Sequence, residues 1–305
     1  MKVIIDTDPG VDDAIALLMA LACNDLEVLG LTTVGGNVSL ARATRNTLAL
    51  LEYARRREVP VARGAARPRR GRFPYSHYFH GPSGLSRRLP RPSVTPVDAS
   101  AVEFLTEQLQ QHPDQITLVA LGPLTNLARL LRRSPAALHK VRRLVVMGGA
   151  VDVPGNVTPH AEFNFYSDPL AAHEVASSGV PLILVDLGAC RRVFITREEA
   201  ERLSSPDPLG RLAAQLLVNW FARDPQRHRF EFYDPLTLAA AIQPDLLKVR
   251  EVTLAVEAED ESRQGESHVV REGGPHRVVE HVDGTRFFRL FRRLLGLSED
   301  SLGDK

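Results

Sequence analysis

The fold of this chain is decided by the stretch Met1-Lys-Val-Ile-Ile-Asp-Thr-Asp-Pro-Gly-Val-Asp-Asp13, which runs directly into the apolar pattern Ala14-Ile-Ala-Leu-Leu-Met-Ala-Leu-Ala22. Val3 to Ile5 is a β-branched run typical of a strand buried on both faces, and Pro9-Gly10 cannot continue it. The apolar spacing that follows predicts a helix. A strand, a turn and a helix in this order indicate an α/β sheet, whose ligand crevice lies at the carboxyl ends of its strands.

Four aspartates are concentrated at this strand-to-helix corner, namely Asp6, Asp8, Asp12 and Asp13. Helix capping and the helix dipole would explain one or two acids, but four carboxylates this close repel one another unless a cation neutralises them. Ligands that are all oxygen favour a hard cation such as Ca²⁺ or Mg²⁺ over zinc. An EF-hand does not fit, because Leu17 stands where that loop needs its final glutamate. We therefore expect a metal site at this corner.

The composition limits the class of protein. A chain of 305 residues is long enough for one large α/β domain or two smaller ones. The net charge of +1 gives no reason to expect nucleic-acid binding. Two cysteines do not suggest a disulfide framework, and we find neither a secretory leader nor an apolar run of the roughly 20 residues that span a bilayer. We expect a cytoplasmic protein without a membrane partner.

Strand and helix patterns alternate through more than half of the chain, as in an α/β fold. Strands are expected at 27–36, 59–62, 116–121, 143–147 and 181–187, and helices at 39–57, 98–112, after Gly122, and at 168–179, 197–203, 207–223 and 234–242. Three late strands are expected at 248–256, 268–271 and 277–282, and Gly273-Gly274 suggests a hairpin between the last two. The basic amphipathic pattern at 286–295 indicates a packed surface helix. No break in composition marks a linker, so we expect a single domain over 1–305.

The segment 67–96 differs from the rest, because it is rich in proline, glycine, arginine and aromatic residues and has no clear periodicity. Loops of this length in compact domains are usually functional lids or disordered segments. The aromatic residues and the histidines at its centre, His77 and His80, favour an active-site lid.

Further motifs recur in order up to residue 235: Thr33-Val-Gly-Gly-Asn37, Gly122-Pro-Leu-Thr-Asn-Leu-Ala128, Met147-Gly-Gly149, Gly155-Asn156, Ala161-Glu-Phe-Asn164 and Tyr233-Asp-Pro235. Together with the opening stretch they resemble the inosine-uridine-preferring nucleoside hydrolases. The resemblance implies a doubly wound, mostly parallel sheet with Ca²⁺ at the strand ends. It also implies hydrolysis of the N-glycosidic bond of a ribonucleoside, and we expect a homodimer or homotetramer.

The resemblance also implies a role for individual residues. Ca²⁺ would be held by Asp8, Asp13, Asp234 and the backbone carbonyl of Leu121, together with ribose hydroxyls. Asp8 would be the general base that deprotonates a Ca²⁺-bound water. The remaining substrate contacts would come from Asp12, Asn37, Met147, Asn156, Glu162 and Asn164. The chemistry is consistent with these roles, because an anionic cluster beneath the sugar stabilises an oxocarbenium-like transition state.

Several of these roles rest on the resemblance alone. Asp168-Pro169, Asp207-Pro208 and Asp234-Pro235 are all plausible helix starts, and nothing local marks one of them as a metal ligand. The asparagines at 37, 156 and 164, taken singly, would more often be turn or cap residues.

Tyr233 is the most serious departure from the family pattern. Purine-active members commonly have a histidine immediately before the last metal-binding aspartate, where it can protonate the leaving base. A phenol, with a pKa of about 10, is a weaker acid at neutral pH. His80 and His228 are the alternative proton donors, because an imidazole titrates near neutral pH. Purine or pyrimidine preference therefore stays open.

Two other functions compete with hydrolysis of nucleosides. Two acids one residue apart after a strand, Asp6 and Asp8, also suggest a phosphatase of the haloacid dehalogenase type, but the midchain offers only Lys140 as the phosphate-binding lysine that such enzymes need. A non-catalytic ribose- or nucleoside-binding protein could keep the calcium site and lack the leaving-group acid. Turnover of ribosides compared with equilibrium binding would separate these interpretations.

Overall fold

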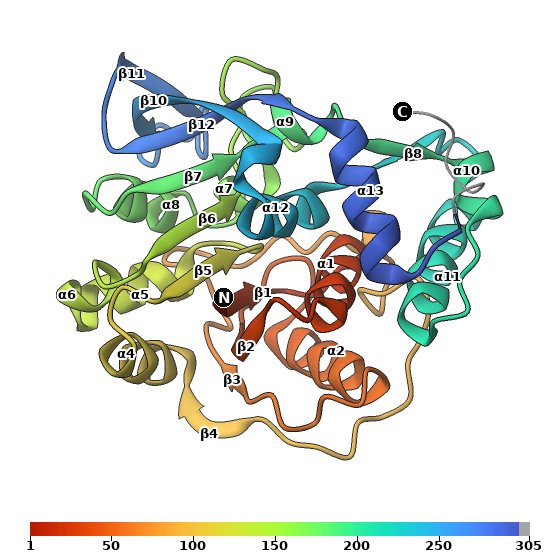
Figure 1. The fold of residues 1–305 in the computed structure, drawn as a ribbon. Coiled ribbons are helices and arrows are strands. Elements are labelled where there is room, and N and C mark those ends of the chain that lie inside the picture. The colour runs from red at the N-terminus through yellow and green to blue at the C-terminus, as the bar shows by residue number, and fades with distance from the viewer. Residues whose placement is uncertain (299–305) are drawn as a thin grey trace.

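A ten-stranded sheet runs through the middle of residues 1–298, the part of the chain that the computed structural model describes (Figure 1). Its strands are β1 (Lys2–Thr7), β2 (Glu27–Thr33), β3 (Val61–Arg63), β4 (Val97–Ser100), β5 (Ile116–Ala120), β6 (Arg143–Met147), β7 (Leu182–Val185), β10 (Leu247–Val256), β11 (Ser267–Glu272) and β12 (His276–Val282). Their order across the sheet is β11-β10-β12-β7-β6-β5-β1-β2-β3-β4. Only β10 is antiparallel to its neighbours, so the sheet is mostly parallel, as expected.

Helices cover both faces of the sheet. They are α1 (Val11–Ala22), α2 (Leu40–Tyr53), α3 (His77–His80), α4 (Ala101–Gln111), α5 (Thr125–Arg133), α6 (Pro135–Leu138), α7 (Phe163–Ser167), α8 (Pro169–Ala176), α9 (Leu187–Cys190), α10 (Arg197–Arg202), α11 (Pro208–Ala222), α12 (Tyr233–Ile242), the 3-10 helix η1 (Pro244–Leu246) and α13 (Gly284–Leu295). One core lies beneath α1, α2, α11, α12 and α13, and the other beneath α4, α5, α6 and α8. The doubly wound α/β architecture is thus confirmed.

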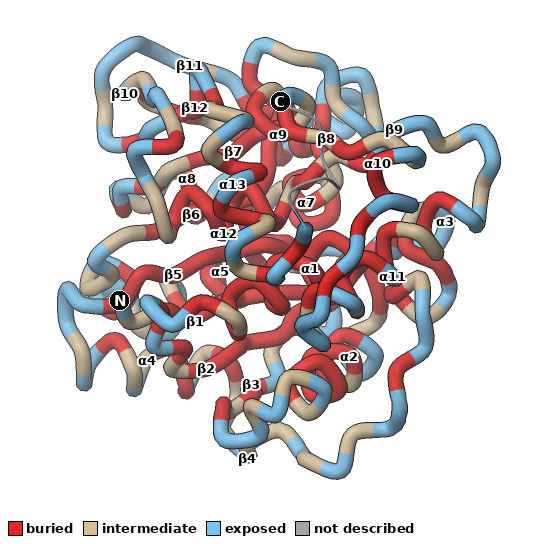
Figure 2. Tube along the Cα trace, turned by 45° about the vertical axis from the view of Figure 1, so that its right-hand side comes forward, coloured by how far each residue is buried: buried red, intermediate tan, exposed pale blue. Residues whose placement is uncertain are grey.

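β1 lies at the centre of this arrangement, between β5 and β2. Val3 and Ile5 pack into one core and Ile4 into the other, because successive side chains of a strand point to opposite faces. α1 follows at once and is buried along nearly all of its length (Figure 2). Since β5, β1 and β2 are parallel, their carboxyl ends meet at one edge of the sheet, where the residues that follow them gather.

Three short strands were not predicted. β4 precedes α4, where the sequence predicted that the helix would begin at 98. Two further strands, β8 (Phe194–Thr196) and β9 (Arg229–Glu231), form a separate antiparallel pair. Such strands are stabilised by partners distant in sequence, so local patterns give little sign of them.

A late antiparallel hairpin is present, but it joins β10 and β11. The expected pairing of β11 with β12 across Gly273-Gly274 is wrong, because β10 lies between these two strands. The Gly273 N–H donates to the Glu251 carbonyl at 2.7 Å, and Gly273 has a φ of 74°, which favours glycine. The glycines therefore carry the chain across the end of β10 to its other edge.

The segment 67–96 has one helical turn, α3, and is otherwise irregular. It packs onto the protein through buried side chains, which include Phe73, Ser76 and His80. Within residues 1–298, no helix combines the length and apolar character needed to cross a bilayer.

Candidate active site

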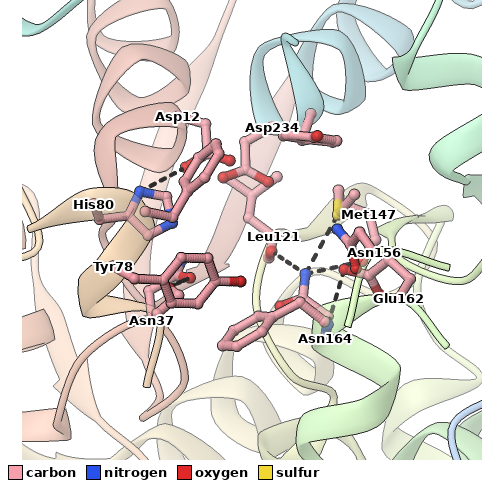
Figure 3. A pocket seen from close by; sticks show the side chains of 14 residues that line it. Asp12, Asn37, Tyr78, His80, Leu121, Met147, Asn156, Glu162, Asn164 and Asp234 are labelled. Atoms are coloured by element: carbon pink, nitrogen blue, oxygen red, sulfur yellow. Dashed lines mark hydrogen bonds and ion pairs between the residues drawn. The ribbon is translucent and has the colours of Figure 1, made fainter. Parts of the chain in front are cut away.

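A cavity opens at the carboxyl edge of the sheet (Figure 3). Its lining comes from many segments and consists of Asp12, Asn37, Ser76, Tyr78, Phe79, His80, Leu121, Met147, Asn156, Glu162, Phe163, Asn164, Tyr233 and Asp234. The structure thus brings together most of the residues singled out from the sequence. Asp8 and Asp13 are fully buried next to this lining, whereas His228 is exposed and is not part of it.

We refer to Asp8, Asp12, Asp13 and Asp234 as the acidic floor. Carboxylate oxygens of Asp12, Asp13 and Asp234 all lie within 4.8 Å of one another. All four side chains are buried, so little water is available to screen their mutual repulsion. Such a cluster is stable as a set of anions only with a compensating positive charge.

Asp13 is the most firmly held member of the acidic floor. One of its oxygens accepts hydrogen bonds from the Thr7 hydroxyl at 2.6 Å and from the Asp8 N–H at 3.2 Å. The other accepts from the Gly10 N–H at 2.9 Å and from the Asn37 amide at 3.1 Å. These four donors fix the direction of the carboxylate, as a preformed metal ligand requires.

Asp8 is held on one oxygen only. Its Oδ2 accepts from the Asn37 N–H at 2.5 Å, whereas its buried Oδ1 has no hydrogen-bond partner. A Cβ at Gly36 would overlap Oδ2, and one at Gly122 would lie 2.5 Å from Oδ1, so any other residue there would displace the carboxylate. Burial, followed by repulsion from Asp13, raises the pKa of Asp8 well above its usual range.

The other two members of the acidic floor show the same electrostatic strain. Burial and the charge of Asp13 raise the pKa of Asp12 to about 8, and burial with repulsion from Asp13 and Asp12 also raises the pKa of Asp234. The Oδ1 atom of Asp12 is buried without a partner. Clustered carboxylates with free oxygens fit a hard divalent cation such as Ca²⁺.

Asp6 does not belong to the acidic floor, although the sequence places it beside Asp8. Its Oδ1 accepts hydrogen bonds from the Thr32 hydroxyl and, at 2.7 Å, from the Asn126 amide. Burial raises the pKa of Asp6 to about 7. Asp6 therefore links β1 to β2 and to α5.

The structure distinguishes the three Asp-Pro pairs that the sequence left equivalent. Asp168 and Asp207 are helix N-caps, and their side chains accept from the backbone N–H groups of Ala171 and Leu209. Asp234 is not a cap, because α12 begins at Tyr233, the residue before it, and its N-cap is Phe232. Its carboxylate is therefore free to join Asp12 and Asp13.

The expected substrate-binding residues surround the acidic floor, and several already hold one another. The Asn164 amide donates to the Leu121 carbonyl at 2.7 Å and approaches the Met147 sulfur at 3.3 Å (Figure 3). Glu162 is the N-cap of α7, and burial raises its pKa to about 7. Asn156 is exposed at the mouth of the cavity.

Asn37 connects the acidic floor to the segment 67–96. Its side-chain oxygen accepts from the Ser76 hydroxyl at 2.6 Å, while its amide donates to Asp13. Sequence reasoning missed Ser76, because no local pattern shows which serine of a loop will reach a strand end.

His80 lies in the cavity lining next to Asp12. Its Nδ1 accepts from the Val11 N–H at 3.0 Å, which leaves Nε2 as the nitrogen that carries the proton. Burial lowers the pKa of His80 to about 3, so the ring is neutral at pH 7, and its 3.7 Å approach to Asp12 is not an ion pair.

We refer to Tyr78, Phe79, Phe163 and Tyr233, the aromatic residues of the lining other than the histidine, as the aromatic rim. Of these, Tyr233 was named as a site residue from the sequence, and Tyr78 and Phe79 belong to the aromatic residues that suggested a lid. The Tyr233 hydroxyl donates to Glu231 at 2.5 Å, and burial together with this carboxylate raises the pKa of the phenol well above its usual range. Tyr233 is therefore an even weaker acid than its type suggests.

Comparisons with known proteins agree with this geometry. Residues 3–289 match the family model for inosine-uridine preferring nucleoside hydrolases. Uridine nucleosidase 1 of Arabidopsis thaliana is 38% identical over 264 residues, which is 85% of this chain and 79% of that protein. The pyrimidine-specific ribonucleoside hydrolase RihA of Citrobacter koseri is 37% identical over 272 residues, 87% of this chain and 86% of the relative.

Solved structures give the same result. A plant nucleoside hydrolase superposes with a TM-score of 0.90 at 34% identity, over 96% of this chain and 98% of the other. A purine-preferring ribonucleoside hydrolase from Gardnerella vaginalis superposes with a TM-score of 0.88 at 27% identity, over 97% and 98%. These matches leave no support for the phosphatase interpretation.

Proposed function

Since the chain belongs to the inosine-uridine preferring nucleoside hydrolase family and is a nucleoside hydrolase, we propose that it cleaves ribonucleosides to ribose and free base with a Ca²⁺-bound water that Asp8 activates. The observation that carries this proposal is the acidic floor, which gathers four buried carboxylates beside a cavity lined by polar and aromatic side chains. An uncompensated cluster of this kind would be costly in any structural role.

Asp8, Asp13, Asp234 and the Leu121 carbonyl would hold the Ca²⁺ ion. When bound, Ca²⁺ supplies positive charge to the carboxylates and lowers the pKa of a coordinated water. Two observations support this ligand set: Asp13 is fixed in direction by four donors, and oxygens of Asp13 and Asp234 lie within 4.8 Å of each other.

Asp8 would act as the general base through Oδ1. Because Oδ2 is occupied by the Asn37 N–H, Oδ1 is the atom free to take a proton from the attacking water. Direct attack by water inverts the anomeric centre, so a β-ribonucleoside would release α-ribose first.

The substrate would lie with its ribose on the acidic floor. Asp12 offers its unpartnered Oδ1 to a ribose hydroxyl, and Asn37, Met147, Asn156, Glu162 and Asn164 would surround the sugar. As the glycosidic bond breaks, positive charge develops on the ribosyl group, and the nearby carboxylates stabilise it.

Of the three leaving-group candidates, His80 is the one that the geometry favours. It lines the cavity with Nε2 as its proton-bearing nitrogen, whereas Tyr233 donates to Glu231 and His228 is exposed. A neutral imidazole is a hydrogen-bond donor to the departing base, so we propose that His80 stabilises the leaving group in this way. The segment 67–96 would act as the lid that carries it.

The names of the relatives suggest the substrate. Because a uridine nucleosidase and a pyrimidine-specific hydrolase are among them, we propose that uridine is a substrate. We further propose that the chain is a single-domain, cytoplasmic homo-oligomer, either a dimer or a tetramer.

A reducing-sugar assay tests the proposal. The purified full chain, loaded with Ca²⁺ and with its metal content measured, is given uridine, cytidine and inosine. We expect ribose release from uridine at least, and NMR of the first product should show the α anomer. Tight binding of nucleosides by the calcium-loaded protein without ribose release would support the non-catalytic interpretation instead.

A further inference from the structure

The pair formed by Tyr233 and Glu231 has no place in the acidic floor, yet Tyr233 lines the same cavity. Glu231 ends β9 and Tyr233 begins α12, so the junction of these elements places a carboxylate beside a phenol. The Tyr233 hydroxyl donates to Glu231 Oε2 at 2.5 Å. The other oxygen of Glu231, Oε1, lies 2.7 Å from the Arg229 guanidinium.

These contacts determine what Tyr233 can offer a ligand. A tyrosine hydroxyl has one proton, and here Glu231 accepts it. Arg229 keeps Glu231 in place by occupying its second oxygen. Toward a ligand, the phenol oxygen can therefore act only as a hydrogen-bond acceptor.

The surroundings of Tyr233 indicate which part of a nucleoside it meets. The carboxylates and amides suited to ribose hydroxyls belong to the acidic floor and its neighbours, whereas Tyr233 lines the cavity with Tyr78, Phe79 and Phe163. Aromatic side chains suit the planar base rather than the sugar. An acceptor among them would meet a polar edge of the base.

On the basis of the proposed function, we propose that the Glu231–Tyr233 pair selects the base: the Tyr233 oxygen accepts a hydrogen bond from the N3–H of uracil. Uracil in a nucleoside has a single N–H, at N3, whereas cytosine presents a bare acceptor at the same position. Two acceptors facing each other in a buried site leave both unsatisfied, which disfavours cytidine. We expect a preference for uridine over cytidine of about tenfold or more in kcat/KM.

Two substitutions test this proposal in different ways. Tyr233→Phe removes the acceptor and keeps the ring, so the ratio of uridine to cytidine should fall to about one. Glu231→Gln should change this ratio further. Because Arg229 requires an oxygen acceptor, the new amide would turn its NH₂ group to Tyr233, which would then direct its own proton into the cavity. The preference should therefore shift toward cytidine.

Tyr53→Phe is the matched control, because the Tyr53 hydroxyl donates to Pro208 on the protein surface, outside the cavity lining. Hydrolysis of p-nitrophenyl riboside, which has no base edge, reports on the acidic floor. It should change less than about threefold in Tyr53→Phe, and in Tyr233→Phe it should fall less than the hydrolysis of uridine does. An unchanged uridine to cytidine ratio in Tyr233→Phe would overturn the proposal. An equal loss of activity of Tyr233→Phe on uridine, cytidine and p-nitrophenyl riboside would also overturn it. A preference of the unmodified enzyme for cytidine that Tyr233→Phe removes would do the same.

The same selectivity can be measured without turnover. Calorimetry of uridine and cytidine binding to calcium-loaded Asp8→Asn, in which hydrolysis should be lost, should show the ratio, and adding Tyr233→Phe to this variant should remove it. If no riboside is hydrolysed but this binding ratio holds, the catalytic proposal fails and the base-selecting role stands. If ribosides are hydrolysed and the ratio does not respond, only the base-selecting role fails.

Discussion

The acidic floor and the aromatic rim border one cavity, but the chain builds them in different ways. Three of the four residues of the acidic floor lie between Asp8 and Asp13, at the junction of β1 and α1. The aromatic rim instead draws on α3, α7 and α12, which are far apart in sequence. If the two regions have the roles proposed above, the comparison teaches that the residues for bond breaking are encoded locally, whereas those for base recognition are brought together by tertiary packing.

The two regions are also held by different contacts. Asp13 is fixed largely by nearby groups, the Thr7 hydroxyl and the Gly10 N–H. The rim depends on Arg227, whose guanidinium donates to the Tyr78 carbonyl at 2.8 Å and lies 4.1 Å from the centre of the Trp220 ring. We therefore expect damage to the floor to abolish chemistry and damage to the rim to weaken substrate binding.

The largest effect is expected for Asp13→Asn. This change removes a charge from the proposed metal site, so ribose release should fall by about 10³-fold or more and calcium affinity should fall with it. Asp6→Asn is the matched control, because Asp6 is also fully buried but bonds to Thr32 and Asn126. Titration calorimetry with Ca²⁺ measures both variants. Equal calcium affinity in the two would show that Asp13 is not a ligand.

This contrast explains how much the sequence could reveal. The acids of the β1–α1 corner share one stretch, so their clustering can be predicted from the sequence alone. Asp6 lies in the same stretch but not in the acidic floor, because its carboxylate bonds to Thr32 of β2 and Asn126 of α5, which are distant in sequence. The role of Asp234 was indicated only by family resemblance, since its distinction from Asp168 and Asp207 is a two-residue difference in where the helix begins relative to the aspartate.

The strands, too, could be predicted where the local sequence pattern is strong, and not where a distant partner decides. Central strands such as β1 and β6 are recognised from their buried apolar runs. The strands that escaped prediction, β4, β8 and β9, are short and only partly buried, and each is stabilised by a partner from another part of the chain. The mistaken hairpin at Gly273-Gly274 has a similar cause, because a glycine pair marks a sharp change of direction but not which strand the chain will pair with next.

The second largest effect is expected for His80→Ala. If His80 donates to the leaving base, uridine turnover should fall by about 10²-fold while hydrolysis of p-nitrophenyl riboside, whose leaving group needs little help, is spared. His77→Ala, in the same helical turn but exposed, is the control. An equal loss on both substrates would mean that His80 serves only to hold the Val11 N–H and the start of α1.

The pH dependence of stability probes the acidic floor and the buried carboxyl groups next to it without mutation. In the folded protein, burial raises the pKa of Asp6 and Glu162 to about 7 and that of Asp12 to about 8. Between about pH 4 and 8 the folded state therefore keeps protons that the unfolded chain has released, and the free energy of unfolding falls as pH rises. Without metal, Tm should drop by roughly 5 °C or more from pH 5 to 8.

Calcium should oppose this loss, because it binds the deprotonated carboxylates of the folded state. Differential scanning calorimetry in EDTA and in excess Ca²⁺ measures both curves. A Tm that stays flat or rises between pH 5 and 8 in EDTA would contradict the electrostatic description of the floor.

The smallest effect is expected for Arg227→Ala at the rim. Loss of the bond to the Tyr78 carbonyl and of the contact with Trp220 should loosen α3, raise KM for uridine by about threefold to tenfold and leave kcat nearly unchanged. The KM of Arg227→Lys, which keeps the charge, should lie between that of the unmodified protein and that of Arg227→Ala. Hydrogen exchange over residues 75–85 should increase in parallel. A fall in kcat with unchanged KM would mean that Arg227 acts on the chemistry rather than on binding.

Asp8→Asn tests the central claim most directly, because it separates metal binding from proton removal. The variant keeps an oxygen for the cation and for the Asn37 N–H but cannot accept a proton from water. Calcium content and single-turnover ribose release from uridine are measured on the same sample. We predict that Ca²⁺ is largely retained while ribose release falls by about 10³-fold or more. Near-normal release with calcium bound would contradict the assignment of Asp8 as the base.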